Sequence, residues 1–70
     1  MMSSADTIKK IRNAMCMQQA EFGQLLGVTK QSVLNYEQNK RKPKRPIIRI
    51  LRELADKNGV EFSLEDFLGE

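Results

Sequence analysis

Two neighbouring stretches of this chain carry side chains that can bind a polyanion and form hydrogen bonds with it. Within residues 29–35, Lys30, Gln31 and Asn35 recur at the spacing of one helix face. In residues 40–45, five of six side chains are Lys or Arg. Amide side chains can bond the edge of adenine bidentately, and clustered cations neutralise phosphates. These residues therefore favour the chemistry of nucleic-acid recognition.

Catalytic chemistry has no comparable set of residues. The sequence contains no histidine, which excludes Ser-His and Cys-His dyads and histidine-ligated metal sites. Gly23 and Gly27 lack the Lys-Ser/Thr pair that follows the glycines of a phosphate loop. Cys16 can be interpreted as a redox sensor, but a small buried residue or a turn residue is the simpler interpretation. We therefore predict a protein that is not an enzyme and has neither a metal nor a cofactor.

Length and charge indicate one small domain whose N-terminal and C-terminal parts carry opposite net charge. Seventy residues predict a single domain, 1–70, with a net charge of +3. Residues 1–52 carry 11 Lys and Arg against three Asp and Glu, whereas residues 53–70 carry one Lys against six. One end therefore suits a polyanion. The single cysteine and the lack of a long apolar run favour a cytoplasmic location, with no membrane partner.

Apolar residues at helical spacing predict an all-α fold. We expect helices after a cap at residue 3 or 4, at about 19–26, at about 29–38, from Pro46 to just before Gly59, and from Ser63 onward. Gly27 is expected to end the second helix in the left-handed conformation. Gly23 costs roughly 1 kcal/mol in a helix interior, which a crossing helix that needs a residue without bulk would justify.

These positions resemble the helix-turn-helix of the Cro/C1-type (Xre-like) regulators. The matching residues are Gln19, Phe22, Gly23, Leu26, Gly27, Val28, Val33 and Tyr36. Residues 37–43, EQNKRKP, look like the family's E-x-G-K-R-x-P segment, and the likeness extends from Ile8 to Leu68. Lambdoid phage repressors and Cro proteins are similar. The resemblance implies a compact five-helix, lambda-repressor-like domain with its helix-turn-helix at about 18–38, which binds operator DNA, usually as a two-fold dimer.

The resemblance also implies roles for individual residues. The helix from about Thr29 to Gln38 would enter the major groove. The expected base contacts are Lys30, Gln31, Asn35 and Leu34. The expected phosphate contacts are Gln19, Thr29, Ser32, Lys40, Arg41, Lys42, Lys44 and Arg45. Of the basic run, Lys40, Arg41 and Lys42 match family positions that contact the DNA backbone; by their charge alone, some of its five cations should pair with phosphates and others should only raise the local potential. Arg12 and Glu37 match a buried ion pair. Lys30 can reach a guanine or a phosphate, and Ser32 can bond a phosphate or simply face water.

Three residues depart from the family pattern. Gln18 stands where Ser or Thr usually caps the second helix, and Asn39 replaces the usual Gly after the third. Leu34 stands where a small polar residue is common; it can touch a thymine methyl or fold back onto the fourth helix.

The sequence thus predicts a sequence-specific DNA-binding transcriptional regulator, a repressor, with double-stranded operator DNA and a second copy as partners. The expected dimer surface is apolar and near the C-terminus: Phe62, Phe67 and Leu68. An antitoxin that binds a toxin and regulates its own operon is the alternative. A third interpretation is non-specific nucleic-acid binding through the basic loop alone, in which Gln31 would have no role.

Overall fold

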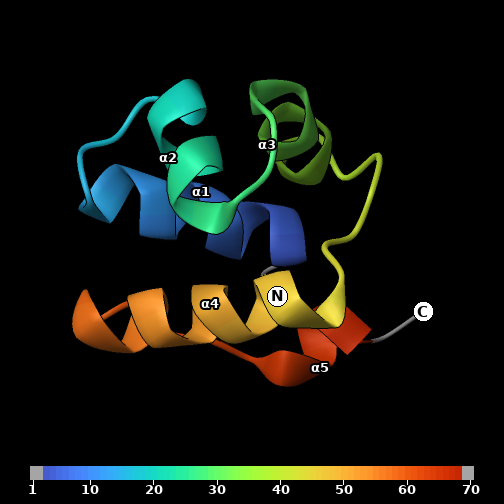
Figure 1. Cartoon of the computed structure of the whole chain (residues 1–70). Coiled ribbons are helices and arrows are strands. Elements are labelled where there is room, and N and C mark those ends of the chain that lie inside the picture. Colours follow the sequence, from blue (N-terminus) through green and yellow to red (C-terminus); the bar gives the residue numbers. More distant parts are fainter. Residues whose placement is uncertain (1–2, 69–70) are drawn as a thin grey trace.

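Helices are the only regular elements in the part of the chain that the computed structural model describes, residues 3–68. They are α1 (Ser4–Ala14), α2 (Gln19–Leu26), α3 (Lys30–Glu37), α4 (Arg45–Lys57) and α5 (Leu64–Leu68) (Figure 1). The predicted all-α, five-helix fold is confirmed for these residues. The first two and last two residues of the predicted domain 1–70 lie outside the described range.

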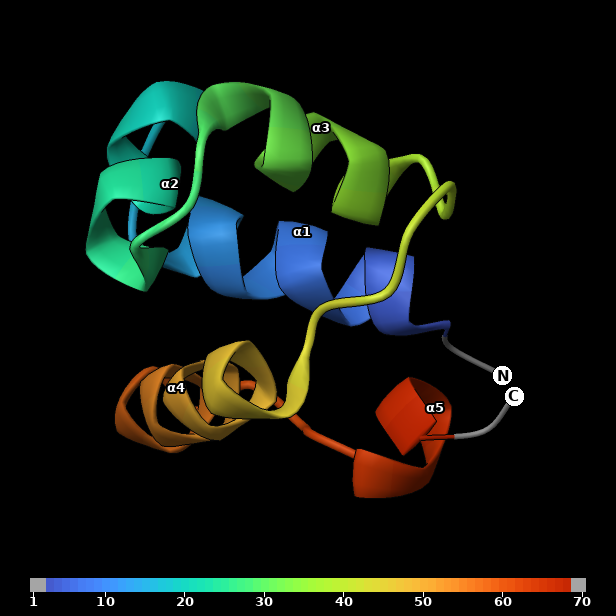
Figure 2. The ribbon, with the colours of Figure 1, turned by 45° about the vertical axis from the view of Figure 1, so that its right-hand side comes forward.

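The helices are arranged on two sides of α1. In both ribbon views α2 and α3 lie on one side of α1, and α4 and α5 lie on the other (Figures 1 and 2). The described chain has a radius of gyration of 10.6 Å. The helix-turn-helix and the C-terminal pair of helices therefore present their outer faces in opposite directions.

Local capping explains where the first three helices begin. Ser3 caps α1 in a capping box with Asp6. At α2, Gln18 donates its backbone N–H to Glu21 Oε1 at 2.9 Å, so the helix start is supported although Gln18 replaces the usual Ser or Thr. Thr29 Oγ1 accepts the backbone N–H of residue 32 at 3.1 Å and caps α3.

The turn between α2 and α3 accounts for both of the glycines around it. Gly27 has φ +78°, the left-handed conformation expected of it. A Cβ on Gly23 would lie 2.8 Å from the carbonyl oxygen of Val28 and 3.2 Å from the Thr29 carbonyl group. The expectation that a crossing helix requires Gly23 is therefore wrong, because the backbone of the turn itself occupies this space.

A residue in the left-handed conformation and a proline explain two further helix boundaries, the end of α3 and the start of α4. Asn39 has φ +60° just after α3, as expected for the residue that ends this helix. Helix α4 begins at Arg45, one residue before the expected Pro46, which lies in its first turn, where the missing N–H costs no helical bond.

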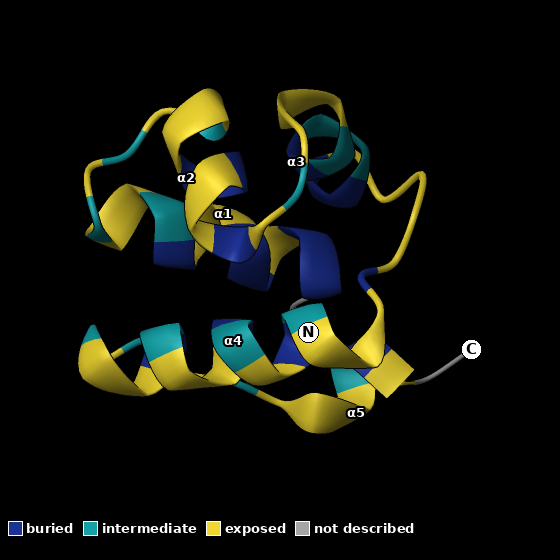
Figure 3. Cartoon of the chain, in the orientation of Figure 1, coloured by how far each residue is buried: buried dark blue, intermediate teal, exposed yellow. Residues whose placement is uncertain are grey.

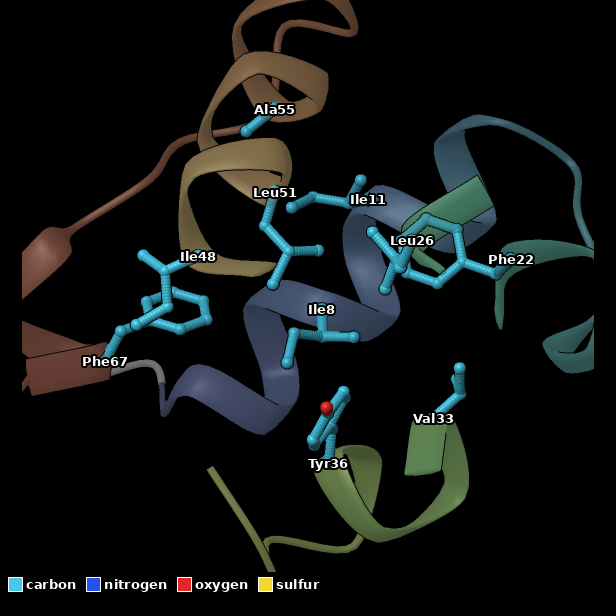
Figure 4. Close-up of a cluster of buried hydrophobic side chains, with 10 residues drawn as sticks. All are labelled: Ile8, Ile11, Phe22, Leu26, Val33, Tyr36, Ile48, Leu51, Ala55 and Phe67. Atoms are coloured by element: carbon cyan, nitrogen blue, oxygen red, sulfur yellow. The ribbon is translucent and has the colours of Figure 1, made fainter. Parts of the chain in front are cut away.

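All five helices contribute to one apolar core (Figure 4). Its buried members are Ile8, Ile11, Phe22, Leu26, Val33, Tyr36, Ile48, Leu51, Ala55 and Phe67. In α4 the most buried positions are Ile48, Leu51 and Ala55, so the buried stripe is centred on Leu51. Phe67 points from α5 toward Ile48, which anchors the last short helix to α4.

Candidate nucleic-acid interface

Helix α3 is held to the rest of the protein by its inward face. Val33 and Tyr36 lie in the core, with exposed fractions of 0% and 5%. Glu37 is also buried and receives two hydrogen bonds from Arg12 of α1, from Nε to Oε2 at 2.6 Å and from Nη2 to Oε1 at 3.1 Å. Arg12 Nη1 also donates to the Met17 carbonyl oxygen at 3.0 Å. The orientation of α3 is therefore set by apolar packing together with a bidentate ion pair.

Gln19 joins this network from the start of α2. Its Nε2 donates to Glu37 Oε1 at 3.1 Å, so residues of α1, α2 and α3 meet at one carboxylate. An amide nitrogen carries two N–H groups. One of them is used by Glu37, and the second can donate to a phosphate oxygen without breaking the contact between the helices.

Polar side chains occupy the outward face of α3. Lys30 and Gln31 are exposed, and Asn35 is half-buried one turn further on. Gln31 Nε2 donates to Asn35 Oδ1 at 3.1 Å. This bond leaves Gln31 with one N–H donor and its Oε1 acceptor, the pair that adenine N7 and N6 require. This bond is not among the contacts expected from the sequence, although the i, i+4 spacing of an amide pair is a signal for it.

The hydroxyl groups of Thr29 and Ser32, at the start of α3, differ in their hydrogen bonds. Thr29 Oγ1 accepts the Ser32 N–H and donates its own proton to Ser32 Oγ, each at 3.1 Å. The Thr29 hydroxyl is thus engaged within the helix. The Ser32 hydroxyl proton is not used in these bonds, so of the two predicted phosphate contacts Ser32 has the better-placed donor.

Leu34 is half-buried and belongs neither to the core cluster nor to the partly buried apolar residues packed against it. Within the described residues, this placement gives no support to the alternative in which Leu34 folds back onto the fourth helix. The partly exposed side chain therefore remains available for a contact with an outside group.

The basic run of residues 40–45 extends from the end of α3 to the first residue of α4. Lys40 and Arg41 are exposed just after α3, where their backbone N–H groups donate to the Asn35 carbonyl oxygen. Pro43 is buried and turns the loop. Beyond Arg41 the run turns toward the C-terminal helices: Lys42 Nζ donates to the Asp66 carbonyl oxygen at 3.3 Å, and Arg45 lines a groove between α4 and α5. Lys44 is exposed and lines a hollow together with Arg41 and Lys42.

The predicted dimer surface requires a correction. Phe67 is 3% exposed and packs in the protein's own core, so it is not available to a second copy. Phe62 is half-buried and stacks on Phe67 with the ring centroids 4.7 Å apart. Of the three predicted residues only Leu68 is well exposed, at 52%, and Leu64 joins it at 42%. Phe67 was misassigned because it faces α4, an orientation that the apolar pattern of a five-residue helix does not determine.

The remaining chemistry of the described residues is limited. Cys16 is exposed in the turn after α1, with φ +55°. No group of three or more Cys, Asp or Glu side chains in residues 3–68 is arranged to hold a metal ion. No helix in the same range has the length and apolar character needed to cross a membrane.

Comparison with known proteins agrees with this geometry. The model of the helix-turn-helix family of Cro/C1 type matches residues 8–63, which is most of the chain and includes all of α2 and α3. No curated protein and no solved structure matches the chain. The matching family is a DNA-binding regulatory domain. The family match and the arrangement of α2, the Gly27 turn and α3 lead to the same conclusion. This chain belongs to the Cro/C1-type helix-turn-helix family.

Proposed function

We propose that this protein is a sequence-specific transcriptional repressor that inserts α3 into the major groove of its operator. The observation that carries the proposal is the division of α3 into two faces. Val33, Tyr36 and Glu37 fasten one face to α1 and α2, whereas Lys30 and Gln31 project from the other. A recognition helix needs this combination, since base readout depends on side chains held in a fixed position.

Base readout would depend mainly on the Gln31–Asn35 pair. Because Asn35 Oδ1 takes one N–H of the Gln31 amide, the free donor and acceptor of Gln31 are held in a defined orientation. We expect this amide to bond an adenine, with Asn35 acting as a positioning residue. Lys30 would contact a guanine or a phosphate, and Leu34 would contact a thymine methyl group. The bond between Gln31 and Asn35 favours readout of specific bases over binding through the basic loop alone, because the loop has no use for a fixed amide.

Phosphate contacts would surround this helix. Gln19, with its second N–H, and the Ser32 hydroxyl are expected on one side, and Lys40 and Arg41 on the other. Each neutralised phosphate adds about 0.9 to the slope of log affinity against log salt. We assign Lys44 a weaker contribution, and we expect little from Thr29, Lys42 and Arg45.

We expect two copies to bind two half-sites about 34–36 Å apart. A stable protein interface buries about 1,200–2,000 Å² in total. With Phe67 in the core, the exposed apolar side chains of α5 are Leu64 and Leu68, too few to supply such an area. The homodimer is therefore expected to assemble on the operator and to be weak in free solution.

A competition binding titration tests the proposal. Labelled DNA from upstream of the gene is titrated with the protein at low and high salt, against unlabelled specific or random duplex. We expect the specific duplex to compete better at both salt concentrations. Equal competition at both would refute sequence-specific binding.

Two variants separate base readout from phosphate binding. Gln31→Ala should weaken specific binding by about 1–3 kcal/mol and leave random-duplex binding unchanged. Lys40→Ala should weaken both to a similar degree and lower the salt slope by about 1. If Gln31→Ala leaves specific binding unchanged, the base-reading role assigned to Gln31 is wrong.

An antitoxin that also represses its own operon is the second candidate. The exposed Leu64 and Leu68 favour it, because they offer an apolar contact on the side of the protein away from α3. Co-expression with the product of a neighbouring toxin-like gene tests it. Relief of growth arrest supports the antitoxin, and absence of such a gene beside this one counts against it.

A further inference from the structure

The outer side of α4 and α5 carries a groove that the proposed DNA contacts do not use. It has a volume of about 300 Å³ and is lined by Arg45, Ile48, Arg49, Arg52, Leu64 and Leu68. The lining residues come from both helices, and α4 and α5 lie on the side of α1 opposite to α3 (Figures 1 and 2). A duplex bound along α3 would therefore leave this groove open.

The chemistry of the groove is an apolar floor beside a row of positive charges. Ile48 is buried, with 6% of its surface exposed, while Leu64 and Leu68 are 42% and 52% exposed. Arg45, Arg49 and Arg52 follow one another at i, i+4 and i+7, so they form a single stripe on α4. The outer side of α4 is exposed along its length (Figure 3).

The charge of this stripe is not balanced within the groove. No carboxylate lines it, and none of the three guanidinium groups forms an ion pair with a described residue. By contrast, a neighbouring hollow that also borders Arg49 and Arg52 contains Glu53 and Asp56. The groove between α4 and α5 thus presents positive charge, without a carboxylate in its lining, to an outside group with negative charge.

We propose that this groove binds an acidic amphipathic helix of a partner protein. The apolar side of such a helix would cover Leu64, Leu68 and the edge of Ile48, and its flanking carboxylates would pair with the arginines of α4. Nucleic acid fits less well, because a phosphate backbone offers no apolar side chain for the two exposed leucines. A protein bound here would be held on DNA through α3, which makes the groove a site for recruiting a second protein to the operator.

A second copy of this chain is a poorer occupant. In a two-fold interface the same patch of both subunits meets itself. Pairing centred on this groove would bring the Arg49 and Arg52 side chains of one copy toward those of the other, which is unfavourable for like charges. An acidic helix avoids this repulsion.

The test uses the full chain and a synthetic probe. The probe is a fluorescent peptide of about 14 residues with leucines at helical spacing flanked by glutamates. Two matched peptides serve as controls, one with lysine in place of glutamate and one with the same composition in an order that breaks the apolar stripe. Fluorescence anisotropy in the absence of DNA measures binding, so the outcome does not depend on the proposed repressor function.

We expect saturable binding of the acidic peptide and at least about tenfold weaker binding of both control peptides. Arg49→Glu should weaken binding of the acidic peptide about fivefold or more, since it replaces attraction by repulsion. Lys9→Glu, the same charge change on exposed α1, should change it less than about twofold. Leu64→Ser should also weaken binding, with the helical circular dichroism of each variant unchanged.

Several results would overturn the proposal. Equal binding of the three peptides, or no saturable binding of the acidic one, would exclude an acidic amphipathic ligand. If Arg49→Glu weakens binding to random duplex by the same factor as binding to the acidic peptide, the arginines of α4 would be assigned to DNA binding. If the protein self-associates in sedimentation experiments, and if Arg49→Glu and Leu64→Ser both abolish this self-association, the groove is an interface between copies.

Discussion

The junction of Arg12, Gln19 and Glu37 predicts an unequal response to the loss of its two charges. Arg12→Met keeps most of the apolar stem but removes both donors to the Glu37 carboxylate. The Glu37 side chain is 4% exposed and would retain only the Gln19 bond to Oε1. Leaving a buried carboxylate without its cation costs about 3–5 kcal/mol.

The reciprocal change should cost less. In Glu37→Leu, the Arg12 side chain is 19% exposed and keeps its bond to the Met17 carbonyl oxygen, so water can reach the freed N–H groups. We expect a loss of about 2–3 kcal/mol, in the range of lost hydrogen bonds to a charged group. The double variant removes both charges and should lose much less than the sum, because apolar residues can replace a buried ion pair at little cost.

Urea unfolding followed by far-ultraviolet circular dichroism measures these differences. A domain of this size has only about 3–5 kcal/mol of stability in total, so Arg12→Met is expected to be largely unfolded in buffer. Trimethylamine N-oxide, which strengthens burial, brings all variants into the measurable range. Lys9→Met, the loss of an exposed cation on the same helix, should stay within about 0.5 kcal/mol of the parent. If Arg12→Met and Glu37→Leu each lower the free energy of unfolding by less than about 1 kcal/mol, and if these losses add in the double variant, the pair behaves like a surface salt bridge. That result would refute the expected cost of a buried, unpaired charge.

Three further substitutions test the local structure by the same unfolding measurement. Gly23→Ala should destabilise the protein by about 1–3 kcal/mol despite a gain in helix propensity, because its Cβ would meet the Val28 carbonyl oxygen at 2.8 Å; Gln24→Ala in the same helix is the control, and equal stability of the two would refute the clash. Cys16→Gly should stabilise by about 1 kcal/mol by relieving the φ of +55°, and no gain would mean that the turn is unstrained. Thr29→Ala should cost about 1 kcal/mol through loss of the α3 cap, a cost that would be absent if the cap contributes nothing.

Most of the helix-turn-helix could be predicted from the sequence because its signals are local. Apolar residues at helical spacing predicted α2 and α3, and four of the residues that match the family pattern, Phe22, Leu26, Val33 and Tyr36, are buried in the structure. A capping residue and a glycine marked the turn between these helices. Such signals act within a few residues, so they need no knowledge of the rest of the fold.

The candidate site could be predicted as a list of residues but not as an arrangement. The resemblance correctly paired Arg12 with Glu37 as residues that meet. The resemblance also implies that Gln19 braces the recognition helix, which agrees with its bond to Glu37, but it did not identify this carboxylate as the partner. It gave no indication that Gln31 donates to Asn35. The sequence predicted that only some charges of the basic run pair with phosphates, but it could not say which; burial of Pro43 and the position of Arg45 beside α5 depend on the tertiary structure.

The sequence by itself thus determined the helices, the turn between α2 and α3 and the residues available for DNA recognition, because spacing, caps and charge are properties of neighbouring residues. Only the tertiary structure decided that Phe67 lies in the core, that three helices meet at Glu37, and that α4 and α5 form a groove away from α3. These outcomes depend on how each helix is rotated about its axis when the shared core is filled. That rotation is set by contacts between residues far apart in the chain.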